Sequence, residues 1–281
     1  MLFDLPPMPP ETQALIQQEC RSTYASLIHA APKEVIALQK SNKSTAESSG
    51  DDVKTSSSDI RNLRRNAIEQ EAFSIGAQAG LAWRYKGIEY ILESNQIEPL
   101  LDRALDFNRV ITQKNILLPV ISEAKESFEM SSDGQTARSS QMTWEIIVNA
   151  RITTTPPSWR EYLYQHAEAP TNAPSGLMPY DRGEQELWRM GICTGFQSGV
   201  EQANLIFTDR LTRLVRDYTG MLRFRTLAAQ QVVSMPRIDE GRLGVSVQSD
   251  RVHVDDRIIR ITDPVRFNNA NQWRAVPGIN Q

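Results

Sequence analysis

Residues 191–203 read Gly-Ile-Cys-Thr-Gly-Phe-Gln-Ser-Gly-Val-Glu-Gln-Ala, and the spacing of their small residues is the feature of the chain that most needs a structural cause. Its small residues recur at every fourth position, at Gly191, Gly195, Gly199 and Ala203. Positions four apart lie on one face of an α-helix. Each glycine inside a helix costs up to about 1 kcal/mol relative to alanine, so a row of them needs a compensating contact. The row indicates a second backbone packed unusually close to this face.

A matching row of small residues lies earlier in the chain, at Ala72, Gly76 and Gly80. It falls within an apolar period that predicts a helix over 59–94, with Ser58 or Asp59 as the N-cap. We therefore predict that the two rows face each other and form the centre of the fold. A kink or a ligand-contact site is the alternative explanation for the glycines.

Two capping boxes predict further helix starts. Ser158-x-x-Glu161 opens a short helix that carries Trp159 and Tyr162. Asp181-x-x-Glu184 opens the long helix that contains the second glycine row and continues towards Val233.

Two segments read as antiparallel strands. Asp133-Gly134 is a tight-turn sequence, and apolar residues alternate after it, so we predict a β-hairpin over 121–152. Near the C-terminus, apolar residues alternate over 243–261 and are separated by Ser249-Asp250 and Asp255-Asp256. This pattern predicts a small antiparallel sheet.

The predicted fold class is α+β and mainly helical. Two long glycine-containing helices pack together, with a β-hairpin and a small C-terminal antiparallel sheet beside them. Residues 1–58 are predicted to be a flexible N-terminal tail and linker, with one short amphipathic segment over 11–39 and a polar tract over 41–59. Residues 59–281 are predicted to form a single α+β domain.

Composition excludes some broad classes of protein. The chain has 281 residues, 40% of them hydrophobic, which is enough for a sizeable core, and a net charge of -3. That charge argues against a surface wholly committed to nucleic acid or to anionic lipid. No apolar run approaches the roughly 18 to 20 residues of a membrane-spanning helix.

The two cysteines, Cys20 and Cys193, are far apart and lack metal-ligand spacing. They form either one disulfide or two thiols, so they do not define the redox compartment. Cys20 follows Gln-Gln-Glu, which lacks the small residues of a lipoprotein cleavage site. The first ten residues show neither a basic n-region nor an apolar h-region, so neither a secretory signal nor a lipobox is visible.

The usual catalytic constellations are missing from the sequence. The histidines, His29, His166 and His253, are scattered and form no HExxH or other ligand spacing. The segment 195–199 places its serine one position late for a nucleophile elbow. No P-loop and no GxGxxG fingerprint occurs. We therefore predict no catalytic, metal or cofactor-binding residues.

Paired carboxylates are the one route to an enzyme that the sequence leaves open. Two acidic groups could hydrolyse a glycosidic bond, including those of peptidoglycan. The candidate pairs, Glu69 with Glu71 and Glu184 with Glu186, are two residues apart and point to different sides of a helix. They are predicted to be solvated charges, and a periplasmic cell-wall-acting hydrolase is kept as the alternative function.

A basic stretch follows the second glycine row. It consists of Arg210, Arg213, Arg216, Arg223 and Arg225, interleaved with the aromatic residues Phe207, Tyr218 and Phe224. Such a pattern can form a nucleic-acid surface. Because the aromatic residues follow the apolar helical period, we predict a structural helix with local ion pairs and no direct nucleic-acid binding.

Several segments, taken in order, form a recognisable series. They are Leu101-Asp102-x-x-x-Asp106-Phe107-Asn108, Leu118-Pro119-Val120-Ile121, Pro156-Pro157-Ser158-Trp159-Arg160-Glu161-Tyr162-Leu163, Glu186-Leu187-Trp188, Gly195-Phe196-x-x-Gly199-x-x-Gln202-Ala203 and Arg213-Leu214-x-Arg216-Asp217-Tyr218-x-Gly220-Met221. This series resembles the DotC family of type IVB (Dot/Icm-type) secretion systems, whose members on IncI conjugation plasmids are called TraI. The resemblance covers roughly residues 60 to 277.

The resemblance implies an outer-membrane lipoprotein of a type IVB secretion or conjugation machine. It implies a structural subunit, without enzymatic activity or cofactor, in a multi-copy assembly on the periplasmic side of the outer membrane. The implied partners are a DotD-like lipoprotein and a DotH-like outer-membrane-complex protein, which the subunit helps to assemble and position.

Under this resemblance, aromatic and arginine residues of the matching segments become candidate interface positions, because interfaces enrich those types. The candidates are Trp159, Arg160, Tyr162, Arg213, Arg216, Asp217 and Tyr218. The alternative for Trp159 is packing within its own domain. We predict that Arg160→Glu weakens partner binding and leaves the fold intact.

Overall fold

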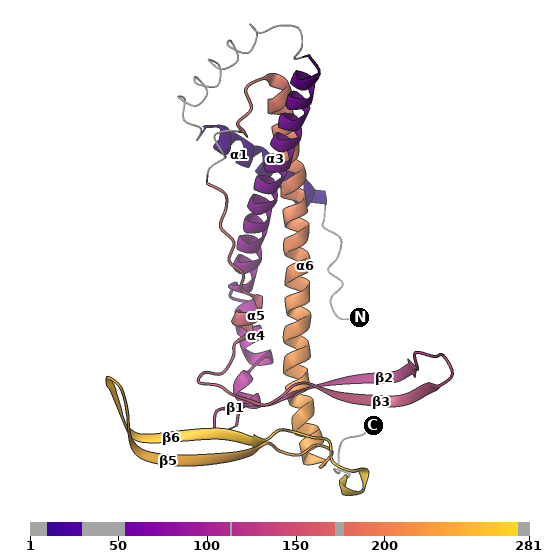
Figure 1. Cartoon of the computed structure of the whole chain (residues 1–281), viewed down its shortest axis with the longest axis vertical. Coiled ribbons are helices and arrows are strands. Elements are labelled where there is room, and N and C mark those ends of the chain that lie inside the picture. The colour runs from indigo at the N-terminus through magenta and orange to yellow at the C-terminus, as the bar shows by residue number, and fades with distance from the viewer. Residues whose placement is uncertain (1–9, 30–53, 113, 172–176, 275–281) are drawn as a thin grey trace. The chain divides into compact units, whose positions relative to one another are not determined.

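The computed structural model describes residues 10–29, 54–112, 114–171 and 177–274 (Figure 1). These residues form long helices and small antiparallel sheets, which confirms the predicted α+β class. The chain groups into two compact units. The first contains the residues up to Glu98 together with Tyr164–Arg210, and the second contains Pro99–Leu163 together with the residues from Leu211 onward.

Among its described residues, three helices build the first unit. Helix α1 spans Pro10–His29, α3 spans Lys54–Leu92, and the unit also holds the first part of α6, which spans Arg182–Ala229. Helix α3 begins earlier than the sequence predicts, so Ser58 and Asp59 lie inside it and are not its N-cap. Residues 54–57, between the observed start of α3 and Ser58, include no glycine or proline that would end a helix there.

The two glycine rows lie against each other where α3 and α6 run side by side (Figure 1). A β-carbon built at Gly76 or Gly80 would overlap a backbone carbonyl of α6, and one at Gly195 or Gly199 would overlap a carbonyl of α3. At Gly191 it would lie 2.7 Å from the β-carbon of Ala72. The two backbones therefore meet directly, and neither helix is interrupted at its glycines. We call this contact the glycine seam.

Helix α1 lies within the segment predicted to be a flexible tail. Its residues Ile16, Cys20 and Leu27 are buried, and Tyr24 is partly buried on the same face. Two small cores result. One combines Ile16 and Cys20 with Ala79, Phe196 and Val200, and the other combines Leu27 with Ile68, Ala72, Ile75, Trp188 and Ile192. Packing thus holds Pro10–His29 as part of the first unit, while residues 30–53 lie outside the described residues.

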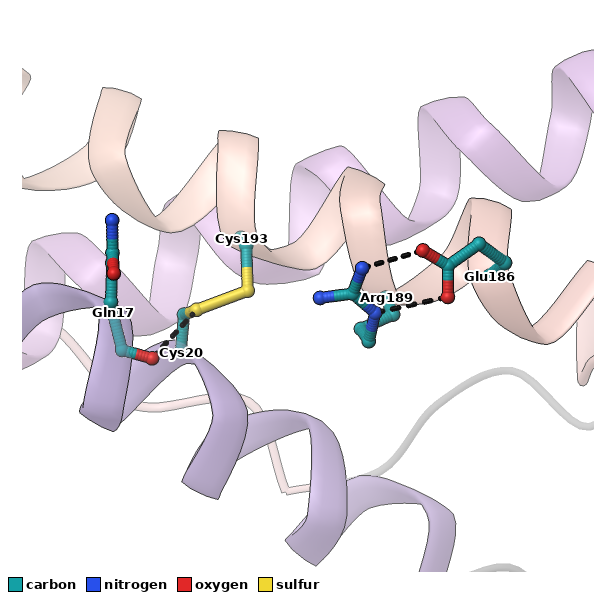
Figure 2. Close-up of a disulfide and its surroundings, with 5 residues drawn as sticks. All are labelled: Gln17, Cys20, Glu186, Arg189 and Cys193. Atoms are coloured by element: carbon teal, nitrogen blue, oxygen red, sulfur yellow. Dashed lines mark hydrogen bonds and ion pairs between the residues drawn. A yellow bond between two sulfur atoms is a disulfide. The ribbon is translucent and has the colours of Figure 1, made fainter.

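A disulfide joins α1 to α6. Cys20 and Cys193 are bonded, with Cα atoms 5.1 Å apart, across a sequence separation of 173 residues (Figure 2). Cys20 is also part of the core beside Phe196. Of the two states that the sequence left open for these cysteines, the structure contains the disulfide.

In the part of the chain that the structure describes, the strands pair as three two-stranded antiparallel ribbons, all in the second unit. The short pair is β1 with β4, Ile116–Leu117 with Arg151–Ile152. The second is β2 with β3, Val120–Met130 with Ala137–Val148, and its turn holds Gly134 at φ +69° as predicted. The predicted single hairpin over 121–152 therefore ends at Val148, because Arg151–Ile152 pairs with β1.

The third ribbon is the predicted C-terminal sheet, made of β5, Arg237–Gln248, and β6, Arg251–Asp263. Ser249 and Asp250 form its turn, as predicted. Asp255-Asp256 is not a turn. Asp255 adopts φ +58° within β6, where the register with β5 shifts near Gly244. Aspartate tolerates this left-handed conformation, so the pair marks a β-bulge in a continuous strand.

Short helices complete the second unit. Helix α4 spans Ile97–Ala104, the 3-10 helix η2 spans Phe107–Val110, and α5 spans Trp159–Leu163 at the predicted capping box. Gly220 of α6 lies under β2, where a β-carbon would lie 2.5 Å from the side chain of Val120. The 3-10 helix η4, Ala270–Gln272, follows the last ribbon. None of the described helices is long and apolar enough to cross a membrane.

Candidate functional site

Three of the recognisable segments meet in the second unit, although they are far apart in the sequence. We call the set the motif cluster. It consists of Asp102, Asp106, Phe107, Trp159, Arg160, Tyr162, Asp217 and Tyr218. Helix α4 carries Asp102, and η2 carries Phe107 with Asp106 as its N-cap. Helix α5 carries the next three residues, and α6 carries the last two.

Asp102 binds the start of α5. Its carboxylate accepts hydrogen bonds from Trp159 Nε1 at 2.7 Å and from Arg160 Nη1 at 2.8 Å. The guanidinium of Arg160 also lies over the Trp159 ring, 4.3 Å from its centroid. The hydrogen bond from Arg160, then that from Trp159, lowers the pKa of Asp102. One carboxylate thus fixes both a buried tryptophan and an arginine.

Phe107 is the aromatic centre of the cluster. Tyr162 stacks on it with ring centroids 6.0 Å apart, and Tyr218 meets it edge-on at 5.3 Å. The Tyr218 hydroxyl donates to the backbone carbonyl of Asp106 at 3.3 Å. The Asp106 carboxylate accepts from the backbone N–H of Asn108 at 3.0 Å and so caps η2.

Asp217 is a buried carboxylate beside these rings. The Tyr162 hydroxyl donates to it at 3.3 Å, and Arg216 contributes an ion pair at 2.8 Å. Arg213 lies one helical turn earlier, 3.9 Å from the same carboxylate. Burial, followed by the negative charge of Asp217, raises the pKa of Tyr162. The charge of Asp217 is therefore balanced within its own unit.

The structure corrects part of the predicted interface. Trp159, Asp217 and Tyr218 are 1%, 6% and 5% exposed, so they bind their own unit and are not available on the surface. Tyr162 is half-buried between Phe107 and Asp217.

The remaining interface candidates are arginines at the surface. The side chains of Arg213, Arg216 and Arg160 are 66%, 44% and 34% exposed. Each nevertheless has an intramolecular acidic partner, either Asp217 or Asp102. Their role at an interface stays a prediction.

The rest of the basic stretch is partly structural. Arg223 Nη1 donates to the carbonyl of Ile121 at 2.6 Å, and Arg225 Nη1 donates to the carbonyl of Arg109 at 2.6 Å. Phe224 is buried. These contacts favour the predicted structural helix with local pairing.

The acidic residues at the start of α6 do not converge. Asp181 Oδ1 accepts from the N–H of Glu184 at 2.7 Å, as the capping box predicts. The Glu184 carboxylate instead binds Arg64 at 3.0 Å and the N–H of Tyr180 at 3.1 Å. Glu186 pairs separately with Arg189 (Figure 2). No local sequence pattern predicts the contact with Arg64, since it lies 120 residues before Glu184.

Two hollows open on the second unit. One, of about 550 Å³, is lined by amide side chains with Ser234, Trp273 and Arg274, and the other, of about 400 Å³, by residues such as Arg109, Phe224 and Met235. Neither is lined by aspartate or glutamate. Among the described residues, no three His, Cys, Asp or Glu side chains form a possible metal site.

The family model described as "Type IV secretory system, conjugal DNA-protein transfer" matches residues 62–275 of this chain. The match contains every residue of the motif cluster and the whole glycine seam. Among curated proteins, none matches the chain.

Proposed function

The chain belongs to the type IV secretory system family of conjugal DNA-protein transfer, and from this premise we propose that it is a structural, non-enzymatic subunit of the machine's outer-membrane core complex. In this role it helps to assemble and position a DotH-like protein together with a DotD-like lipoprotein, in several copies, at the periplasmic face of the outer membrane.

The observation that carries the proposal is the internal pairing of the motif cluster. Asp102, Asp217 and Tyr218 direct their polar groups to partners in the same unit. Catalytic groups, in contrast, are presented to a substrate in a cleft. Because these residues stabilise the structure of their own unit, they favour a structural role in assembly over a catalytic role.

The alternative function, a cell-wall-acting hydrolase, needs two carboxylates facing one substrate. Glu184 and Glu186 point to different arginines, and the two hollows of the second unit have no acidic lining. These facts favour the structural subunit.

The disulfide supports a location outside the cytoplasm. Disulfides form and persist in oxidising compartments such as the bacterial periplasm, and are rare where thiols are kept reduced. Cys20–Cys193 joins two helices of a packed core, which fits a structural bond.

The test is co-expression of the full-length gene with its neighbouring DotD-like and DotH-like genes, followed by membrane fractionation and affinity purification. We expect the three proteins to co-purify from the outer-membrane fraction. A soluble monomer without partners would contradict the proposal.

Surface arginines allow a sharper version of the experiment. Arg213→Gln with Arg216→Gln removes two exposed charges beside Asp217, and Arg189→Gln removes one exposed charge on α6 in the first unit. We expect the double variant to reduce partner recovery and the control variant to retain it. If both variants recovered the partners equally well, Arg213 and Arg216 would not be part of the interface.

A further inference from the structure

The two hollows of the second unit adjoin each other. Ala228 and Met235 line both the larger hollow, of about 550 Å³, and the smaller one, of about 400 Å³. Met235 is 58% exposed, so it lies at the surface where the two hollows meet. We call the two hollows together the arginine groove, because arginine residues line both of them.

The positive charge of the arginine groove is not balanced by its own lining. Arg109 and Arg225 line the smaller hollow, Arg274 lines the larger one, and neither hollow is lined by aspartate or glutamate. Among the described residues, the side chains of Arg109 and Arg274 have no hydrogen-bond or ion-pair partner. Arg225 donates from Nη1 to the carbonyl of Arg109, and its other N–H groups remain available. The groove therefore holds three guanidinium groups without a carboxylate.

Several arginines elsewhere in the same unit already bind carboxylates. Arg160, Arg216 and Arg223 form ion pairs at 2.8, 2.8 and 3.3 Å with aspartate or glutamate of their own unit. A guanidinium binds a carboxylate strongly, often through two parallel hydrogen bonds. The arginines of the groove can offer the same bonds to carboxylates of another molecule.

Amide side chains give the larger hollow a second kind of binding group. Gln231, Asn271 and Gln272 line it, and their side-chain amides have no partner among the described residues. A primary amide both donates and accepts hydrogen bonds, as a backbone peptide group does. A helix bonds its own peptide groups internally, whereas an extended segment has free N–H and C=O groups to offer. The amides therefore favour an extended segment over a helical one.

Backbone hydrogen bonds hold the walls of the larger hollow in place. The N–H of Ser234 donates to the carbonyl of Arg266, and the N–H of Asn268 donates to the carbonyl of Val232, both at 2.8 Å. Trp273 Nε1 donates to the carbonyl of Asn268 at 3.0 Å, which fixes the orientation of the ring. The Trp273 side chain nevertheless remains 45% exposed. A binding surface that is already ordered loses less entropy when a partner binds.

From these contacts we propose that the arginine groove binds an extended acidic segment of a partner protein. Aspartate or glutamate side chains of the segment pair with Arg109, Arg225 and Arg274, and its peptide groups bind the amide side chains. Its apolar side chains cover Met235 and Trp273. Arginine, methionine and tryptophan are residue types that protein interfaces enrich. The inference deepens the proposed function, since it rests on the partners of that assembly to supply the segment.

The lining of the groove favours a protein segment over a nucleic-acid strand. Single strands bind by stacking successive bases on aromatic rings. Two aromatic residues line the groove, Phe224 and Trp273. Phe224 is 1% exposed, so Trp273 is the one lining ring on which a base could stack.

Fluorescence anisotropy of a labelled peptide tests the proposal with the purified full-length chain. The probe is a peptide of about eight residues, made of glutamate, serine and leucine, which in extended form spans about 26 Å. The matched control peptide has lysine in place of each glutamate. We expect the acidic peptide to bind at low salt, more weakly at high salt, and the lysine peptide not to bind.

Charge-reversal variants assign the binding to the arginine groove. Arg109→Glu and Arg274→Glu change exposed side chains, and each should weaken binding of the acidic peptide about tenfold at low salt. Arg109→Lys keeps the charge and should weaken binding less. The matched control is Arg251→Glu, which makes the same charge change at an exposed residue of β6 that lines neither hollow. It should leave binding unchanged, and circular dichroism of every variant detects unfolding.

Competition identifies the class of ligand. Unlabelled acidic peptide should displace the probe, whereas oligothymidylate and phosphatidylglycerol vesicles of equal total charge should displace it much less. Equal displacement by either competitor would overturn the assignment to a protein segment. Absence of peptide binding, or equal effects of Arg109→Glu and Arg251→Glu, would overturn the groove itself.

The proposed function and this inference fail separately. Peptide binding is measured on the chain alone, so it persists if the outer-membrane partners do not co-purify. Co-purification in turn can depend on other surfaces, so it persists if the peptide does not bind.

Discussion

The glycine seam of the first unit is tightly packed, whereas the β5–β6 ribbon of the second unit leaves apolar side chains exposed. At Gly195, the backbones of α3 and α6 leave no room for a single added carbon. At Val254, three quarters of the side chain is exposed. The seam is completed within the chain, so its residues are limited by internal packing. The ribbon has apolar surface that its own unit does not cover, which is typical of a surface for another protein.

Filling the seam should have the largest effect. Gly195→Leu would drive a side chain into the backbone carbonyl of Phe73, and a destabilisation of more than about 3 kcal/mol is expected. Aggregation or loss of the cooperative urea transition is the readout. Gly87 is the matched control, since a β-carbon there meets nothing within 4 Å. Gly87→Ala should stabilise the chain by about 0.5–1 kcal/mol. A normal urea transition for Gly195→Leu would show that the helices separate easily.

Removing the disulfide should have the next largest effect. The double variant Cys20→Ser with Cys193→Ser loses a cross-link between α1 and α6, and a loss of about 2–4 kcal/mol is expected. Urea denaturation of the variant, and of the native chain with and without a reducing agent, measures it. Reduction should shift the native chain and leave the double variant unchanged. Equal midpoints for all samples would mean that packing alone holds α1.

Asp102 gives a pH-dependent effect of intermediate size. Hydrogen bonds from Arg160 and Trp159 lower its pKa, so its contribution to stability is complete above the ordinary aspartate pKa. That contribution is lost as the pH falls through the lowered pKa. We expect Asp102→Asn to lower the melting temperature at neutral pH and to approach the native chain in acid. If the difference in melting temperature between the variant and the native chain did not depend on pH, the charge of Asp102 would not be the cause of the stabilisation.

Arg160→Glu should now reduce stability, contrary to the prediction from sequence that it leaves the fold intact. The new carboxylate would face Asp102, where the native guanidinium forms an ion pair at 2.8 Å. The introduced carboxylate and that of Asp102 would repel each other beside the Trp159 ring. Thermal melting measures this effect, and Arg160→Lys is the control. An unchanged melting temperature for Arg160→Glu would restore the original prediction.

The smallest effect on folding is expected on the ribbon. Val254→Thr keeps the size and strand propensity of an exposed side chain, so stability should change by no more than about 0.5 kcal/mol. Urea denaturation measures this change, and a large loss of stability would show that Val254 packs within its own unit.

The sequence predicted the features that depend on local pattern. The four-residue glycine spacing predicted the seam, Asp181-x-x-Glu184 predicted the start of α6, and Asp133-Gly134 predicted a turn. Each depends on residues within one or two turns of chain. Such patterns are readable because helix and turn geometry fix which neighbours meet.

Features that depend on distant partners were not predictable. From sequence, Trp159 is a candidate interface residue with packing in its own domain as the alternative, and the partner that decides between them, Asp102, lies 57 residues away. The docking of α1 depends on Cys193, which lies 173 residues beyond Cys20. Asp255-Asp256 resembles a turn because aspartate favours both turns and left-handed bulges. Side-chain type alone does not distinguish these outcomes.

The disulfide also limits the order of events during biogenesis. A ribosome adding 5–20 residues per second needs roughly 9–35 s to proceed from Cys20 to Cys193, which lies 173 residues later. Throughout that interval the first thiol has no partner on its own chain. Because the sequence has two cysteines, mispairing within one molecule is impossible. The available error is a bond between two nascent copies, and burial of Cys20 beside Phe196 cannot prevent it until Phe196, which follows Cys193, has been made.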